Sequence, residues 1–342
     1  MKNKILFISK KKMLTYSDCN TIPDGPISSG LTNSINFVLD LLKELKIESN
    51  YEMAVDGNCI DKFLTIHKPT VLILEAIWVT PEKIAQLQKL HPKVLFMCRI
   101  HSQITFLANE GIAMDWLYQY RDLNVTIACN HKSAVDDLSK VGINSVLLPN
   151  YYKITNTPEI LERDDRYINI SCFGAIRPMK NHLAQAISAM YFADVIGKKL
   201  RFFINVNREE QGGNSVLKNL RNLFKNSEHD LVECPWMTHV QFIDLVKTMD
   251  IGMQVSLSET FNIVAADLID NNIPMVVSKE IFWLPFYTKA KATSIDSIVF
   301  KLMIAYYFGR TKVSKFINKL SLKYYNYNSK KLWKEYFQNY LK

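Results

Sequence analysis

Long apolar runs and paired cysteines are the two features that this 342-residue sequence lacks. No apolar run approaches the roughly 18 residues that a membrane-spanning helix requires. The apolar stretch after Met1 ends at Lys10, which argues against a secretory signal peptide. The six cysteines are far apart and form no C-x-x-C pair, which argues against a zinc or disulfide framework. We therefore expect a cytoplasmic globular protein, long enough for two domains of about 150 residues.

Positive charge is concentrated at the C-terminus. Residues 1–155 carry 17 Lys/Arg against 15 Asp/Glu, residues 156–310 carry 17 of each, and the last 32 residues carry eight lysines against Glu335 alone. This last segment is also rich in aromatic residues: Phe316, Tyr324, Tyr325, Tyr327, Trp333, Tyr336, Phe337 and Tyr340. Two interpretations are open. The segment is an amphipathic helix with aromatics inward and lysines in water, or it binds the phosphates of a nucleic acid or an anionic membrane.

Short apolar runs alternate with helical patterns, which is typical of a parallel α/β architecture. The first five predicted strands are Lys4–Ser9, Thr70–Glu75, Val94–Ile100, Val125–Cys129 and Val146–Pro149. After a polar stretch at 153–166 the second five are Ile168–Phe173, Leu200–Val206, Leu231–Cys234, Ile251–Val255 and Met275–Ser278. A helix is predicted at Asn33–Leu45, after a polar loop at Thr15–Thr32. We predict two Rossmann-like domains, 1–155 and 165–310, that face a cleft, followed by a basic aromatic helical segment, 311–342.

An acidic motif lies in Ser256–Ser278, SLSETFNIVAADLIDNNIPMVVS. Glu259 ends a strand-like run and is predicted to begin a helix, which would place Asp267 about two turns along the same face. The backbone N–H groups of Thr260, Phe261 and Asn262 would then form an anion-binding helix start. Considered without other evidence, two carboxylates at this spacing are more often a solvated helix face.

The acidic motif resembles the E-x7-E region of GT-B glycosyltransferases, especially the retaining family 4. The resemblance implies that Glu259 contacts the transferred sugar and that Asp267 contacts the ribose of the donor nucleotide. Three positions depart from the family pattern. Asp267 replaces a glutamate, and Asn262 and Asn272 stand where glycine is usual.

A basic motif, Ile168–His182 (INISCFGAIRPMKNH), places Arg177 and Lys180 just beyond a predicted strand. Two cations at a strand end suit a diphosphate, with arginine in bidentate contact and lysine as a point charge. Such cations are also common as ordinary surface charges. The motif resembles the family's G-R-x-x-x-x-K-N segment, which implies that Arg177 and Lys180 neutralise the leaving diphosphate.

The resemblance extends to other segments. Ser28–Leu31 resembles the family's glycine loop, which implies that Gly30 approaches the donor phosphates, and His101, after Arg99, matches an acceptor-domain histidine near the sugar. Val146–Asn150 resembles the interdomain hinge, and the C-terminus resembles the helix that crosses back to pack on the first domain. Arg99–Trp116 resembles glycosyltransferase-like proteins of tailed bacteriophages.

The resemblance implies a retaining glycosyltransferase that uses a nucleotide-sugar, UDP-sugar by preference, as its substrate and no further cofactor. No Asp-x-Asp motif ends an apolar strand, so we expect no catalytic metal. Two acceptors are open: a hydroxymethylated pyrimidine in phage DNA, bound through the basic C-terminus, or a lipid-linked or surface glycan at a membrane. A third alternative is a catalytically degenerate protein of this fold that only binds nucleotide or DNA.

Overall fold

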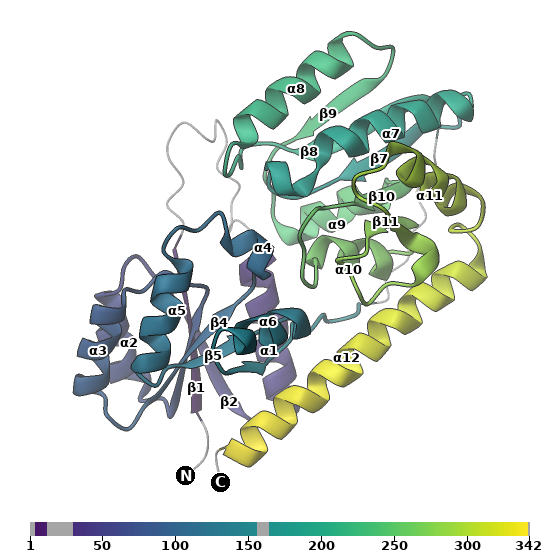
Figure 1. Cartoon of the computed structure of the whole chain (residues 1–342). Coiled ribbons are helices and arrows are strands. Elements are labelled where there is room, and N and C mark those ends of the chain that lie inside the picture. The colour runs from purple at the N-terminus through teal and green to yellow at the C-terminus, as the bar shows by residue number, and fades with distance from the viewer. Residues whose placement is uncertain (1–3, 12–29, 156–163, 341–342) are drawn as a thin grey trace. The chain divides into compact units, whose positions relative to one another are not determined.

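The computed structural model describes residues 4–11, 30–155 and 164–340, the side chains of residues 339 and 340 excepted. The chain divides into two compact units (Figure 1). Unit 1 contains the elements β1 to β6 and the chain from Asn326 onward, and unit 2 contains Ile154–Tyr325. Each unit is built on its own six-stranded sheet.

Unit 1 alternates strands and helices along the chain. Its elements are β1 (Lys4–Lys10), α1 (Gly30–Glu44), β2 (Glu48–Ala54), α2 (Cys59–His67), β3 (Val71–Glu75), α3 (Pro81–Leu90), β4 (Leu95–Ile100), α4 (Ile104–Leu107), α5 (Ala113–Asp122), β5 (Thr126–Cys129), α6 (Lys132–Lys140) and β6 (Ser145–Leu147). The strand order is β2-β1-β3-β4-β5-β6, and every pairing is parallel.

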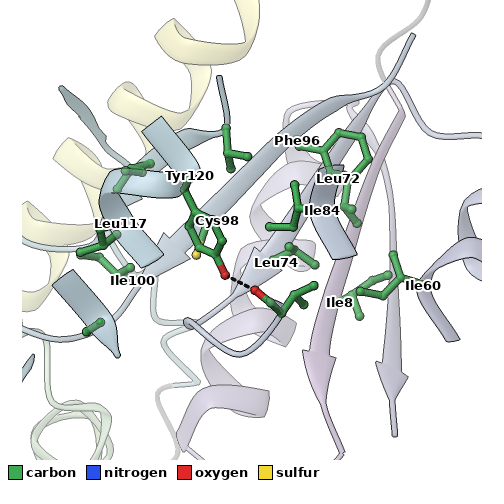
Figure 2. Packing of buried hydrophobic residues seen from close by; sticks show 14 of the residues in the cluster. Ile8, Ile60, Leu72, Leu74, Ile84, Phe96, Cys98, Ile100, Leu117 and Tyr120 are labelled. Carbon is green, nitrogen blue, oxygen red and sulfur yellow. Dashed lines mark hydrogen bonds between the residues drawn. The ribbon is translucent and has the colours of Figure 1, made fainter. Parts of the chain in front are cut away.

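Both faces of the first sheet are covered, as its nearly continuous apolar strands predict. One face packs on α2, α3, α5 and α6, and Figure 2 shows Leu72, Leu74 and Phe96 of this face beside Ile84 and Tyr120 of the helices. The opposite face packs on α1 and the end of the C-terminal helix. Successive residues of a strand point to opposite faces, so each strand contributes to both cores.

Unit 2 repeats this plan. Its elements are β7 (Tyr167–Cys172), the short 3-10 helix η2 (Pro178–Lys180), α7 (His182–Val195), β8 (Lys199–Asn205), α8 (Gly213–Lys225), β9 (Asp230–Cys234), α9 (His239–Lys247), β10 (Ile251–Gln254), α10 (Ile263–Asp270), β11 (Met275–Ser278), the 3-10 helix η3 (Phe286–Thr288), β12 (Lys289–Ala290) and α11 (Ile295–Tyr307). The parallel strands have the order β12-β11-β10-β7-β8-β9. Helices α7, α8 and α11 share a core with one face of the sheet.

Glycine allows a close helix approach at Gly252 in β10. A Cβ atom built there would lie 2.6 Å from Leu268 of α10 and 2.6 Å from Met275 of β11. A side chain at this position would therefore require Leu268 or Met275 to change its conformation.

The last helix, α12 (Lys312–Tyr340), begins in unit 2 and ends in unit 1. In unit 1, Trp333 is buried, lies 6.3 Å from Phe7 between ring centroids, and donates from Nε1 to the carbonyl of Pro149 at 2.8 Å. Tyr336 and Phe337 join the same core. The predicted return of the C-terminal helix to the first domain is thus confirmed.

The structure differs from the sequence predictions at several places. The strand β2 was not predicted, because its sequence ESNYEMA is polar and lies at a sheet edge with little burial. The two-residue strand β12 was also missed. Helix α10 begins at Ile263 rather than at Glu259. The predicted packing of the C-terminal aromatics against the protein holds for Trp333, Tyr336 and Phe337, but Phe316, Tyr324 and Tyr327 are 67–68 % exposed.

No helix in the described part of the chain is both long enough and apolar enough to cross a membrane. Cys19, Ser28, most of the predicted loop Thr15–Thr32, much of the polar stretch 153–166 and the side chain of Tyr340 lie outside the described residues.

Candidate functional site

The chain order of the second sheet defines the place where a ligand is expected. Strand β7 lies between β8, which follows it in the chain, and β10, which comes later. Open parallel sheets bind ligands at such a switch point, beyond the carboxyl ends of the strands. The loop after β7 carries Arg177 and Lys180, and the loop after β10 carries Glu259. The two motifs, separated by about 80 residues in the sequence, therefore lie on neighbouring strand ends.

Lys180 and Glu259 form an ion pair at this edge of the sheet. Their side chains are only 12 % and 9 % exposed. The backbone joins the same two loops, because Leu257 N donates to the carbonyl of Met179 at 2.8 Å. Two site residues predicted from different motifs are thus in direct contact.

Two amide side chains, those of Asn181 and Gln185, hold these loops in place. Asn181 donates from Nδ2 to the carbonyls of Val255 (3.1 Å) and Ala292 (2.8 Å), and Gln185 accepts from Val255 N at 2.8 Å while it donates to the carbonyl of Lys180. Sequence reasoning missed Gln185. The signal that could have identified it is a polar residue within the apolar face of a helix. Gln185 is fully buried.

Arg177 contacts a different loop from that of Lys180. Its Nη1 lies 3.4 Å from Glu210, which also accepts from Arg208 Nε at 2.8 Å. The backbone of Ile176 exchanges hydrogen bonds with Arg208 and Glu210, so the loops after β7 and β8 are joined. Arg177 is therefore anchored beside the switch point with two thirds or more of its side chain covered.

A buried histidine reports the positive potential of this region. His182, the first residue of α7, is 1 % exposed. Burial lowers its pKa to about 3, and the charges of Lys180 and Arg177 act in the same direction. The imidazole is therefore neutral at pH 7 and adds no charge to the two cations. Because Lys180 is paired with Glu259, the local charge favours an anion only when Lys180 leaves Glu259 for that anion.

The helix that carries Asp267 begins later than predicted, and the anion-binding role of Thr260, Phe261 and Asn262 stays a prediction. Thr260 and Phe261 precede the helix, and Asn262 is its N-cap, with φ at 57°. The side chain of Asn262 accepts from Ala265 N at 2.9 Å and donates to Gln254 Oε1 at 2.8 Å. The left-handed backbone at Asn262 prevents the helix from starting earlier. Consequently Glu259 and Asp267 do not share a helix face.

Phe261 has a packing role in this loop. Its ring is stacked on Trp283, with centroids 5.6 Å apart, and on Tyr325, with centroids 4.7 Å apart. The indole Nε1 of Trp283 donates to the carbonyl of Phe261 at 2.7 Å. Thr260, which precedes Phe261 in the chain, is only 8 % exposed. The cluster fixes the segment that follows Glu259.

Asp267 is nearly inaccessible to solvent and pairs with a histidine that sequence reasoning missed. His239 Nε2 lies 3.0 Å from Asp267 Oδ1, and the two side chains are 31 % and 1 % exposed. Burial lowers the pKa of His239, but the hydrogen bond and charge of Asp267 outweigh it and raise the pKa overall. His239 begins α9 after the N-cap Thr238, and its position gave no sequence signal.

In unit 1 the predicted His101 belongs to a charged cluster beyond β3 and β4. Its Nε2 is hydrogen-bonded to Glu75, the last residue of β3. Arg99 donates from Nη1 to Glu75 at 3.1 Å and from Nη2 to Asn150 Oδ1 at 2.7 Å, and both Arg99 and Glu75 are fully buried. Glu75 was predicted only as a strand end. The signal was a carboxylate that closes the apolar run TVLILE.

Charges in this cluster control the protonation of its members. Burial raises the pKa of Glu75, but Arg99 and His101 outweigh that effect and lower it overall. Burial lowers the pKa of His101, and Glu75 only partly opposes the shift. We therefore expect an ionised Glu75 and a neutral His101 at pH 7. The predicted Gly30 is the first residue of α1, in the same unit, and is partly exposed.

Within the described residues, no group of three or more His, Cys, Asp or Glu side chains is arranged to hold a metal ion. The sequence matches no protein-family model and no curated protein. The fold, by contrast, is similar to that of solved structures.

OtsA in its apo form matches with a TM-score of 0.71 and 10 % identity, and the match covers 99 % of each chain. Sucrose-phosphate synthase of Thermosynechococcus elongatus matches with a TM-score of 0.71 and 10 % identity over 98 % of this chain and 100 % of that one. An E. coli structure described as trehalose-6-phosphate bound with UDP-2-fluoro glucose matches with a TM-score of 0.68 and 9 % identity over 99 % of each chain. This chain has the GT-B fold. The predicted fold class is confirmed.

Proposed function

We propose that this protein is a retaining glycosyltransferase that transfers a sugar from a nucleotide-sugar to an acceptor. The observation that supports it best is the pairing of Lys180 with Glu259 at the switch point of a parallel sheet. One of these groups suits a diphosphate and the other suits sugar hydroxyls. The similar structure bound with UDP-2-fluoro glucose favours a UDP-sugar as the donor.

The proposed chemistry needs charge stabilisation at the leaving diphosphate. Lys180 and Arg177 would supply positive charge to the phosphate oxygens as the glycosidic bond breaks. Glu259 would accept hydrogen bonds from the sugar. Asp267, which is 1 % exposed beside His239 at 3.0 Å, would receive the ribose hydroxyls once His239 moves aside. The start of α10, including the amides of Ile263 and Val264, replaces Thr260, Phe261 and Asn262 as the helix end next to this region.

For unit 1 we propose that His101 acts on the acceptor side of the reaction and that Glu75 orients its imidazole. The neutral imidazole donates from Nε2 to the ionised Glu75, which leaves Nδ1, 3.5 Å from Asn130 Nδ2, as the nitrogen that can accept from a hydroxyl group. Gly30, at the start of α1, is the proposed contact with the donor phosphates from this unit.

The backbone conformation argues against the alternative that the protein is catalytically degenerate and only binds nucleotide or DNA. Asn262 and Asn272, which stand where glycine is usual, have φ angles of 57° and 61°. Asparagine tolerates this left-handed region better than most residues, so both departures preserve the local backbone. Asp267 remains a carboxylate on α10. The departures therefore leave the acidic and basic groups that the proposed reaction needs.

Two acceptors remain proposals. A hydroxymethylated pyrimidine in DNA is favoured by the eight lysines of the last 32 residues. A lipid-linked or surface glycan is favoured by the aromatic residues of α12 that face solvent. Tyr325, Trp333, Tyr336 and Phe337 are buried, which removes four of the rings that base stacking would need.

The test is a thermal-shift panel with UDP, GDP, CDP, ADP and their sugar conjugates. The variants are Arg177→Ala and, as a control, Arg221→Ala, which breaks a surface ion pair with Glu233 in the same unit. A ligand at about 100 times its Kd stabilises by roughly 2.7 kcal/mol. We expect one nucleotide to shift the wild type and the control but not Arg177→Ala. No shift with any nucleotide would refute the donor site.

A further inference from the structure

The part of α12 that begins in unit 2 exposes a row of apolar residues. On the face that it buries against the protein, Ser314, Asn318, Asn326 and Ser329 are polar and Leu322 and Tyr325 are apolar, and all six are at most 8 % exposed. On the opposite face lie five residues that are 52–68 % exposed: Val313, Phe316, Leu320, Tyr324 and Tyr327. The lysines Lys312 and Lys323 are exposed along the border of this stripe.

The five exposed residues form one continuous stripe. Their spacing of three, four, four and three residues places them on a single face of an α-helix. Isolated exposed apolar residues are common on proteins, but an aligned row of this length is not. We call Val313, Phe316, Leu320, Tyr324 and Tyr327 the α12 stripe.

Other exposed apolar side chains of unit 2 belong to elements that contact the buried face of α12. Phe286 in η3 is 83 % exposed, and its neighbour Tyr287 donates from its hydroxyl to Asn318 Oδ1 at 2.6 Å. Phe282 is 45 % exposed, with its ring centroid 5.8 Å from that of Tyr325 on α12. Phe308 is 38 % exposed, 5.2 Å from the Tyr287 ring.

The chain segment that carries this surface is mostly basic, although Arg310 pairs with Asp250 and Lys330 with Glu44. From Lys279 to Lys334 the chain has 12 Lys/Arg against two acidic residues, Glu280 and Asp296. Lys289 and Lys301 lie within the aromatic region, where they donate to the carbonyls of Phe282 (3.0 Å) and Phe286 (3.3 Å). An apolar face bordered by lysines fits an anionic bilayer, in which acyl chains receive the apolar groups and headgroups receive the ammonium groups.

We propose that the α12 stripe, with its bordering lysines, docks this protein onto an anionic membrane surface. Aliphatic Val313 and Leu320 favour a lipid interface over a nucleic acid, because bases stack on aromatic rings and not on aliphatic chains. The proposal rests on the glycosyltransferase function in one respect only: it assigns the acceptor to the class of membrane-borne glycans or lipids. The membrane contact itself does not depend on that activity.

The experiment measures co-flotation of the full chain with vesicles of phosphatidylcholine alone or with 30 mol % phosphatidylglycerol, a chosen composition of roughly physiological surface charge. One variant changes the stripe, Phe316→Ser/Leu320→Ser/Tyr324→Ser. Its control changes three exposed apolar residues of unit 1, Ile66→Ser/Leu90→Ser/Val141→Ser. A charge variant, Lys312→Gln/Lys319→Gln/Lys323→Gln, is matched by Lys62→Gln/Lys89→Gln/Lys93→Gln. Circular dichroism confirms that each variant is folded.

We expect binding to the anionic vesicles that weakens with salt and falls at least tenfold in the stripe and charge variants but not in the controls. Each lysine near an anionic surface contributes roughly a fivefold change in partition. Absence of vesicle binding, or equal binding by the stripe variant, would overturn the proposal. DNA binding or concentration-dependent self-association that the stripe variant loses, without vesicle binding, would assign the surface to those partners instead.

The same variants are tested for nucleotide binding by thermal shift. Vesicle binding without any nucleotide shift would leave the membrane surface intact and refute the proposed glycosyltransferase. A nucleotide shift without vesicle binding would refute the membrane surface and leave the proposed glycosyltransferase intact. The two proposals therefore fail separately.

Discussion

Lys180 and Glu259 neutralise each other at the carboxyl edge of the second sheet, with side chains 12 % and 9 % exposed. A nucleotide diphosphate that binds there must compete with Glu259 for the ammonium group of Lys180. Once Lys180 turns to phosphate, the carboxylate of Glu259 becomes available to sugar hydroxyls. The ion pair thus couples the two halves of the proposed donor site.

This competition gives a prediction for Glu259→Gln. Removal of the carboxylate leaves Lys180 without its anionic partner, so we expect UDP to bind several-fold more tightly than to the wild type. Transfer of the sugar should become slower at the same time, because the glutamine amide is a weaker acceptor for sugar hydroxyls. Isothermal titration with UDP and turnover with the UDP-sugar measure the two effects.

The control for Glu259→Gln is Asp244→Gln, which removes the acidic partner of Lys247 on the surface of α9. It should change neither quantity. Weaker UDP binding by Glu259→Gln would contradict the competition between Glu259 and phosphate for Lys180.

The pKa of His182 predicts a loss of stability in acid. Burial lowers it to about 3, so the folded protein keeps this imidazole neutral while the unfolded chain protonates it near pH 6.5. The stabilisation is complete above pH 6.5 and decreases as the pH falls toward 3. Between pH 6.5 and 5 the loss is up to about 2 kcal/mol, at 1.36 kcal/mol per pH unit. Urea unfolding at pH 6.5 and pH 5 should show this loss of unfolding free energy in the wild type and not in His182→Gln. The same loss in both proteins would refute the prediction.

The left-handed asparagines predict different effects of glycine and alanine. At Asn272, with φ at 61°, Gly should be tolerated within about 1 kcal/mol, whereas Ala should destabilise by about 1–2 kcal/mol. At Asn262, Ala also removes the cap to Ala265 N, so its effect should be larger by roughly 1 kcal/mol. Urea unfolding of the four variants measures these differences. An Ala variant as stable as the Gly variant would contradict the backbone argument.

The order of elements and the basic motif could be predicted from the sequence because both depend on local patterns. Apolar runs located ten strands, and the cations of Ile168–His182 lie directly beyond one of them. The start of α10 could not be predicted, because it depends on the left-handed backbone of Asn262 and on the contacts of Phe261 with Trp283 and Tyr325.

Partners of buried charges were equally hidden in the sequence. The pairing of His239 with Asp267 joins two helices through residues that are 28 positions apart, and that of Glu75 with Arg99 joins two neighbouring strands. Only the strand register of the tertiary fold brings Glu75 opposite Arg99. Single residues of the site could thus be chosen from motifs, whereas their contacts required the sheet topology.

The buried cluster in unit 1 gives the last prediction. Arg99 is the main partner of the fully buried Glu75, and its guanidinium also lies 5.3 Å from the centre of the Trp333 ring. Arg99→Met leaves Glu75 without that charge, so unfolding should require about 3–5 kcal/mol less free energy. Adding Glu75→Gln to Arg99→Met should recover part of the loss, since a neutral amide is less unfavourable in the same site.

The control is Arg121→Met, a surface arginine paired with Asp122, which should change stability by less than about 1 kcal/mol. Urea unfolding measures the three variants. A double variant less stable than Arg99→Met would show that the bond of Glu75 with His101 outweighs the cost of its unpaired charge.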